Sequence, residues 1–363
     1  MANNRFAGRA IDRPRERAML ALLLFFLSLD LSLGQYDHAN AYGVPAILIF
    51  GDSTVDAGNN NVFSTIMHSN HAPYGRDFGF PTGRFSNGLL APDIVAQKLN
   101  LPFPLAFTSP NATGDNLIFG ANFASAASGL VDSTASLFNV ASSTQQLKWF
   151  ASYRQQLERI AGPDRAQSIL SRALYVISSG SNDYIYYRLN TRLSSQYNNE
   201  QFRELLIKQT SQFIQELYNV GGRRFAVVSV PPLGCLPSEI TTAGKRDRSC
   251  VEDLNSKAVA HNVALQQLLT RTKASLPGTK VAYLDCYSVL FDAIHNPAKY
   301  GFSETNRGCC GSGLIEVGDL CNGLSMGTCS DSSKFVFWDS FHPTQAMYGI
   351  IAEVFYNQAA AVL

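Results

Sequence analysis

Short apolar segments alternate with longer amphipathic segments along most of the chain. The apolar segments lie at 46–50, 117–124, 173–177, 225–230 and 280–285, and small or polar residues follow most of them. Continuous apolar runs of this length are typical of strands that are buried on both faces of a parallel sheet. We therefore expect these segments to form a mainly parallel sheet.

Amphipathic segments between these runs predict helices. Within 144–160, the apolar residues Leu147, Phe150, Leu157 and Ile160 recur at helical spacing. Further helices are expected at 90–99, 201–219, 251–276 and from about 343 to 360. Strands that alternate with helices predict an α/β fold in which helices cover both faces of the sheet. Because no linker interrupts this pattern, we expect residues 45–363 to form a single domain.

The first 34 residues have the order of a secretory signal peptide. Arginines precede the apolar run 18–29, and small residues follow it at 32–34 and 39–41. Asp30 and the shortness of the run argue against a membrane anchor. We expect cleavage near Gly34, or as late as residue 41. The mature protein would then be extracellular, in the apoplast or cell wall if the chain comes from a plant.

Composition narrows the classes of function. With 46% hydrophobic and 16% charged residues over 363 positions, the chain can bury a sizeable core, as globular proteins do. A formal net charge of +1 and the lack of a basic stripe give no reason to expect a nucleic-acid partner. No later stretch of the sequence is apolar and long enough to span a membrane. The oligomeric state stays open.

Secretion changes the interpretation of the seven cysteines, because an oxidising compartment favours disulfides. Six of them lie in loop sequence rich in Gly, Ser and Asp. Cys235 and Cys250 are close enough in sequence to form a local bridge. Cys286 follows a predicted core strand, so we expect it to be a free, buried thiol.

The four remaining cysteines lie close together near the C-terminus. The adjacent pair Cys309 and Cys310 would bond Cys321 and Cys329, in an order that the sequence leaves open. A zinc site is the competing interpretation, but the sequence holds no Cys-x-x-Cys pair.

Two features predict surface positions. Asn111 begins the only N-glycosylation sequon, Asn-Ala-Thr. His68 and His71 lie in the polar loop 59–81 without a carboxylate at matching spacing, so we expect surface residues there and no metal site.

The segment 46–61, AILIFGDSTVDAGNNN, is the first candidate for chemistry. Ser53 follows the carboxyl end of the first predicted strand, where open α/β sheets place their ligands. Gly51 permits a tight bend there, because it has no Cβ. The competing interpretation is a simple Ser or Asx turn after a strand.

Asp339 and His342 form a second candidate near the C-terminus. An aspartate three residues before a histidine can accept a hydrogen bond from the imidazole Nδ1–H, which leaves Nε2 to take a proton from a hydroxyl. Of the six histidines, only His342 has this arrangement. The competing interpretation is a helix N-terminus with a capping acid.

A serine hydrolase also needs donors that face the developing oxyanion. The backbone N–H groups of Ser53 and Gly129 and the side-chain amide of Asn182 are candidates, because each follows a predicted strand. Parallel strands end at one edge of the sheet, so these groups should converge there. Taken singly, Gly129 and Asn182 could equally be turn residues.

Ser325 is a competing nucleophile, because Gly323-Leu324-Ser325-Met326-Gly327 matches the pattern Gly-x-Ser-x-Gly. That motif requires a strand before the serine and a helix after it. The segment lies between two cysteines with no apolar run on either side, so we do not expect Ser325 to act.

Four segments resemble sequence blocks of the plant GDSL esterase/lipase family, within the SGNH hydrolase superfamily, and occur in the family's order: IFGDSTVD, GANFAS, GSND and DSFHPT. The resemblance implies a flavodoxin-like three-layer α/β/α sandwich. It implies Ser53 as nucleophile, His342 as base and Asp339 as the orienting acid. Gly129 and Asn182 would complete the oxyanion hole with the Ser53 amide. We expect no metal and no cofactor.

The sequence departs from the family's pattern at two positions. Thr54 replaces the usual leucine after the serine. Ala127 stands where relatives often have glycine. The backbone donor of the oxyanion hole could therefore lie a position or two away from Gly129.

These residues lead to three hypotheses for the function. The first is a secreted esterase or lipase that hydrolyses carboxylic esters through an acyl-enzyme on Ser53. The second is an acyltransferase, in which an alcohol intercepts the same intermediate, as in cutin polymerisation by some relatives. The third is a catalytically silent wall or carbohydrate-binding protein. Lipid, wall acetate and small phenolic esters all stay open as substrates.

Overall fold

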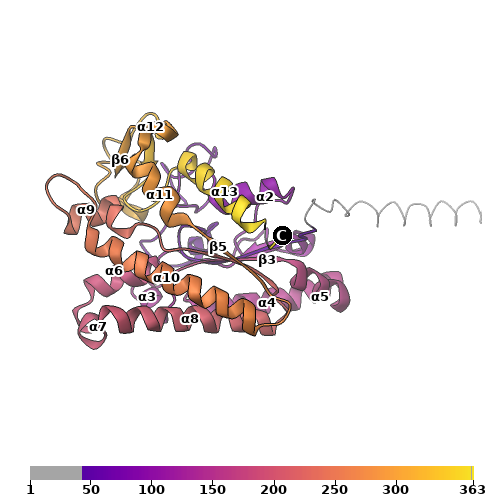
Figure 1. The fold of residues 1–363 in the computed structure, drawn as a ribbon. Coiled ribbons are helices and arrows are strands. Elements are labelled where there is room, and N and C mark those ends of the chain that lie inside the picture. Colours follow the sequence, from indigo (N-terminus) through magenta and orange to yellow (C-terminus); the bar gives the residue numbers. More distant parts are fainter. Residues whose placement is uncertain (1–42, 361) are drawn as a thin grey trace, which may run out of the picture. The chain divides into compact units, whose positions relative to one another are not determined.

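The computed structural model describes residues 43–360, 362 and 363 (Figure 1). The signal peptide predicted at residues 1–34 lies outside the described residues and stays a prediction. No helix among the described residues is long and apolar enough to cross a membrane.

Five strands form one parallel sheet. They are β1 (Ile47–Gly51), β2 (Gly120–Asn122), β3 (Leu174–Ser178), β4 (Arg224–Val228) and β5 (Lys280–Leu284). Their order is β2-β1-β3-β4-β5, and every neighbouring pair is parallel. This is the flavodoxin-like order of a doubly wound sheet, which confirms the predicted fold class. The strand predicted at 117–124 is shorter than expected, because a 3-10 helix, η3 (Gly114–Phe119), takes up its first half.

Alternate residues of β1 contribute to two separate cores. Ile47 and Ile49 pack on one face of the sheet, and Leu48 and Phe50 pack on the other. Both faces are therefore buried, which explains the unbroken apolar pattern of the strands.

Helices cover each face of the sheet (Figure 1). One face carries α2 (Ala91–Lys98), α11 (Cys286–His295) and α13 (Gln345–Ala359). The other carries α4 (Ser143–Ala161), α5 (Pro163–Arg172) and the C-terminal halves of α8 (Asn199–Asn219) and α10 (Glu252–Ser275).

No pattern in the sequence predicted the shorter elements. A second, two-stranded parallel sheet joins β6 (Glu304–Gly308) to β7 (Phe335–Phe337). Because β6 reads Glu-Thr-Asn-Arg-Gly, it has no apolar pattern that could signal a strand. The remaining short elements are α3 (Asp132–Ser136), α6 (Ser181–Leu189), α7 (Thr191–Gln196), α9 (Pro237–Ala243), α12 (Pro297–Tyr300), η2 (Asn59–Val62), η4 (Leu233–Cys235), η5 (Gly318–Leu320) and η6 (Ser332–Lys334).

Three disulfides are present. The Cys235–Cys250 bridge is the one that the sequence predicted. The order that the sequence left open is Cys309–Cys329 and Cys310–Cys321.

Cys286 is free, as predicted, but it is half-buried and not fully buried as expected. It begins α11 directly after β5, where the chain leaves the core of the sheet. Removal from water raises the pKa of its thiol to about 12, so the thiol stays protonated and unreactive near neutral pH.

The end of β1 requires glycine. Gly51 has a φ of +143°, and a Cβ at this position would overlap the carbonyl oxygen of Ser178 on the neighbouring strand. We predict that Gly51→Ala lowers the free energy of unfolding by about 3 kcal/mol or more, because backbone strain and overpacking add. Chemical denaturation measures this loss.

Gly114→Ala is the matched control. Gly114 also has a positive φ, +55°, but open space surrounds the position of its missing Cβ. Its loss should be only about 1 kcal/mol. Equal losses in the two variants would show that the close approach to Ser178 is unimportant.

Candidate active site

Ser53 lies just past β1, in a turn that side chains hold in place. The N–H and hydroxyl of Thr54 both donate to Asp52 Oδ1, at 3.0 and 2.7 Å. The side-chain amide of Gln146 holds Gly51 in place. Its Oε1 accepts from the Gly51 N–H and its Nε2 donates to the Gly51 carbonyl, each at 2.9 Å. The position of Ser53 is therefore fixed from both the strand and the helix α4.

Ser53, His342 and Asp339 form a hydrogen-bonded line. Ser53 Oγ lies 2.7 Å from His342 Nε2. The other imidazole nitrogen, Nδ1, lies 2.9 and 2.8 Å from the two oxygens of Asp339. An ionised carboxylate can only accept, so Nδ1 carries a proton and Nε2 is left to accept from the serine hydroxyl. This is the arrangement in which a histidine can act as general base.

Backbone bonds fix the Asp339–His342 segment. Asp339 Oδ1 accepts from the N–H groups of Phe341 and His342, at 2.8 and 2.7 Å. The N–H of Trp338 donates to the carbonyl of His342 at 2.7 Å, which closes the turn after β7. The ring of Phe85 packs against the imidazole with centroids 4.9 Å apart. His342 thus has little freedom to turn away from Ser53.

A pocket opens beside this line. Its wall includes Ser53, His342 and Asn182, together with Ala126 and Ala127 from the loop after β2. Most other lining residues are apolar and come from α6, the segment after α3 and the loops around the site: Met67, Phe85, Leu137, Phe138, Ile185, Leu189, Leu236, Val317 and Phe341.

Two of the three predicted oxyanion donors lie at this pocket. Asn182 Nδ2 donates to the carbonyl of Ser128 at 2.8 Å, which leaves the second N–H of its amide group available. Among the described residues, the N–H groups of Ser53 and Ala127 donate to no protein acceptor.

Gly129, the third predicted donor, is placed elsewhere and does not line the pocket. A Cβ at 129 would overlap the carboxylate of Asp183. Asp183 accepts from the N–H of Leu130 at 2.7 Å, so the chain passes this carboxylate too closely for any side chain. Close packing therefore explains the glycine, and Ala127 faces the pocket two residues earlier.

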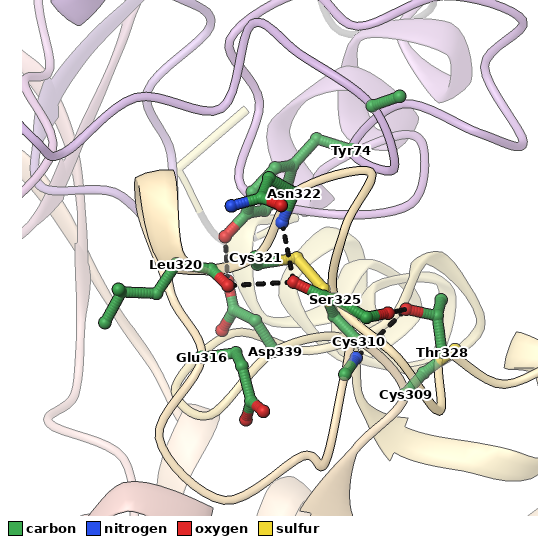
Figure 2. Close-up of a disulfide and its surroundings, with 12 residues drawn as sticks. Tyr74, Cys309, Cys310, Glu316, Leu320, Cys321, Asn322, Ser325, Thr328 and Asp339 are labelled. Atoms are coloured by element: carbon green, nitrogen blue, oxygen red, sulfur yellow. Dashed lines mark hydrogen bonds between the residues drawn. A yellow bond between two sulfur atoms is a disulfide. The ribbon is translucent and has the colours of Figure 1, made fainter.

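Ser325 has a structural role in a loop (Figure 2). Its hydroxyl donates to the carbonyl of Leu320 at 2.9 Å and accepts from the N–H of Asn322 at 3.0 Å. In the part of the chain that the structure describes, no strand lies directly before Ser325 and no helix directly after it. The Gly-x-Ser-x-Gly match therefore lacks the context that a nucleophile requires.

Among residues 43–360, no histidine other than His342 contacts Ser53 through a hydrogen bond. His68 and His71 are half-buried, and both lie near a carboxylate that the sequence did not reveal, Asp319, at 3.6 and 3.4 Å. His261 is buried in α10, where removal from water lowers its pKa to about 4, so it stays neutral. Across residues 43–360, 362 and 363, no group of three or more His, Cys, Asp or Glu side chains could hold a metal ion.

Sequence reasoning missed three residues that support the site. Gln146 anchors the end of β1, and Asp183 anchors the loop after β2. Tyr74 donates its hydroxyl to Asp339. Asp183 could have been found, since it directly follows Asn182 in a block that resembles the family. Nothing in the sequence links Tyr74 to a residue 265 positions away.

The buried carboxyl group of Asp183 should make the stability of the protein depend on pH. Burial raises its pKa from 3.8 to about 6, even though hydrogen bonds from Leu130, Val131 and Thr134 oppose the shift. A raised pKa means that the folded state binds more protons than the unfolded state between about pH 4 and 6. Stability from this group is therefore present at low pH and is lost as pH rises through that window, by up to about 3 kcal/mol.

We predict that Asp183→Asn is less stable than the wild type, and that its free energy of unfolding falls less between pH 4 and 6. Denaturant titrations at several pH values measure both effects. Asp115→Asn, at an exposed position, is the control and should leave the slope unchanged. If Asp183→Asn had the same pH slope as the wild type, the buried carboxyl would not titrate in this window.

Comparisons with known proteins give the family. Residues 47–355 match the family described as GDSL-like Lipase/Acylhydrolase. GDSL esterase/lipase APG of Arabidopsis thaliana is 41% identical over 96% of this chain and 99% of its own length. Two further GDSL esterase/lipases of that plant are each 45% identical, over 85% of this chain and 88% or 89% of theirs. A solved lipase, Lip_vut3 from a goat rumen metagenome, is 13% identical and covers 87% of this chain and 98% of its own, with a TM-score of 0.39. On the sequence matches, the chain belongs to the GDSL-like lipase/acylhydrolase family.

Proposed function

We propose that the protein is a serine esterase that hydrolyses carboxylic esters through an acyl-enzyme on Ser53. The observation that carries this proposal is the line Ser53–His342–Asp339, which ends at an apolar pocket. His342 Nε2 takes the proton of the serine hydroxyl as Oγ bonds to the ester carbonyl carbon. His342 then returns that proton to the departing alcohol oxygen, which leaves the acyl group on Ser53. Water, activated by His342 in the same way, releases the acid and restores the hydroxyl.

The negative charge that forms on the carbonyl oxygen needs donors. We assign this role to the N–H groups of Ser53 and Ala127 and to the side-chain amide of Asn182. All three residues line the pocket beside the nucleophile. Ala127 replaces Gly129 in this assignment, since Gly129 packs against Asp183. One such donor is typically worth about 10²–10³ in rate.

The pocket favours an apolar acyl group. Aliphatic and aromatic side chains from α6, the segment after α3 and neighbouring loops make up most of its wall. Polysaccharide acetates would leave much of this surface uncovered, whereas a medium or long acyl chain would remove it from water. We therefore place lipid-like acyl esters ahead of wall acetates and small phenolic esters.

We also propose that the enzyme works outside the cell. Three disulfides support an oxidising compartment, and the arginine-rich, apolar and small-residue order of the first 34 residues supports export. Asn111 is exposed in the structure, where a glycan could attach.

Ser53→Ala should abolish turnover of a short-chain p-nitrophenyl ester and labelling by a fluorophosphonate, because only the hydroxyl can form the acyl or phosphonyl bond. The label on the wild type should map to the peptide that contains Ser53. Ser325→Ala is the matched control and should keep near-normal turnover. A label on Ser325, or turnover that survives in Ser53→Ala, would refute the mechanism.

The acyl preference is tested with p-nitrophenyl esters from acetyl to dodecanoyl. Each methylene that the pocket buries contributes about 0.8 kcal/mol, which is about fourfold in kcat/KM. Rates should therefore rise from acetyl to medium chains, and Ile185→Ala should flatten this rise. Val62→Ala changes an exposed apolar side chain that does not line the pocket, so it should have no effect. Equal rates for acetyl and octanoyl esters would contradict an apolar acyl site.

A further inference from the structure

Tyr74 reaches the catalytic aspartate from a distant part of the chain. Its side chain is 1% exposed, and its hydroxyl lies 2.7 Å from Asp339 Oδ2. Figure 2 shows the two side chains end to end, beside the Cys310–Cys321 disulfide. The mechanism derived above gives this tyrosine no role.

The direction of this hydrogen bond is fixed. The N–H of Gly318 donates to the Tyr74 oxygen at 2.9 Å, so the hydroxyl proton is free to point only at Asp339. Burial first, and the negative charge of Asp339 second, raise the pKa of Tyr74 well above its ordinary value. The phenol therefore keeps its proton and remains a donor at every pH at which the enzyme could work.

The two carboxylate oxygens of Asp339 have different partners. Oδ1 accepts from the N–H groups of Phe341 and His342 as well as from the imidazole. Oδ2 accepts from the imidazole and from Tyr74 alone among the described residues. Within the described part of the chain, Tyr74 is thus the only donor besides the imidazole that holds this oxygen in place.

The surroundings keep Tyr74 rigid. Its ring packs edge-on against Phe85 at 5.6 Å and against Trp338 at 6.3 Å, both fully buried. Gly318 lies in the loop that the Cys310–Cys321 disulfide closes, and the Cys310 N–H donates to the carbonyl of Trp338, directly before Asp339. Packing that locks a side chain in one rotamer makes its hydrogen bond more effective at orienting a partner.

We propose that Tyr74 is a positioning residue that orients Asp339 and, through it, the His342 imidazole. This inference rests on the proposed serine-esterase function. Without the phenol, Oδ2 would carry more uncompensated negative charge and would be freer to rotate. The imidazolium form of His342 would be favoured, and the imidazole would be held less well against Ser53.

Other titratable groups also face this chain of bonds. The charge of Asp319 adds to that of Asp339 in raising the pKa of Tyr74. The ring of His71 lies 5.7 Å from the Tyr74 ring. The buried Asp52 interacts with His342 from the side of β1. These groups stay in place in a Tyr74→Phe variant, so a change in pH dependence would report the lost hydroxyl.

Tyr74→Phe keeps the ring and removes the donor. We expect kcat to fall about tenfold with little change in KM, as for the loss of one hydrogen bond to a charged group. The acid limb of the pH–rate profile should move to higher pH, by up to about one unit. Tyr153→Phe is the matched control, because Tyr153 is equally buried and donates to the Leu117 carbonyl, away from the site. It should lower stability without moving the profile.

Two further measurements test the role of Tyr74 if the Tyr74→Phe variant does not fold or if the protein has no esterase activity. If Tyr74→Phe does not fold, 3-fluorotyrosine at position 74 provides a stronger donor in the same shape, and the acid limb should move to lower pH. The NMR signal of the proton between His342 Nδ1 and Asp339 requires no turnover, and it should move in Tyr74→Phe but not in Tyr153→Phe. An inactive wild type with the expected NMR shift would refute only the esterase proposal. An unmoved signal, or an active variant with an unmoved pH profile, would overturn the role of Tyr74.

Discussion

The fully buried carboxylate of Asp339 is the constraint on which the rest of the site depends. An ionised group with no access to water is costly unless donors surround it, and here they come from its own turn, from His342 and from Tyr74. The disulfide-rich segment encloses the turn. Cys310 donates its N–H to the carbonyl of Trp338, and the next loop accepts from the N–H of Ser340 through the carbonyl of Glu316. The small sheet and its disulfides thus act as the support of one side chain.

The site lies where two parts of the fold meet, the five-stranded parallel sheet and the segment that follows the two-stranded sheet β6-β7. The parallel sheet delivers Ser53 after β1, the loop with Ala127 after β2 and Asn182 after β3 to one edge, because parallel strands end together. His342 arrives from outside this sheet, between β7 and α13. The two parts meet at the 2.7 Å contact between Ser53 Oγ and His342 Nε2. A shift in either part of the fold would separate Ser53 Oγ from His342 Nε2.

Local patterns predict the fold and identify Ser53, Asp339 and His342 as a candidate site. Apolar runs locate four of the strands within a few residues, and the three-residue spacing of Asp339 and His342 suffices to pair them. Predictions failed where contacts are distant in sequence. The sequence could not show that Asp183 fills the space beside Gly129, because only the fold brings these two residues together. Tyr74 and β6 left no local signal, since a tyrosine in a polar loop and a charged strand are both defined by what they contact.

A crystal structure of the protein inactivated by an alkyl phosphonate would test the central claim most directly, because the adduct resembles the tetrahedral intermediate. The account predicts phosphorus bonded to Ser53 Oγ, and the phosphonyl oxygen within about 2.7–3.1 Å of the N–H groups of Ser53 and Ala127 and of Asn182 Nδ2. The alkyl chain should lie along the apolar wall that includes Ile185 and Val317. Phosphorus on another residue, or a phosphonyl oxygen that faces solvent, would contradict it.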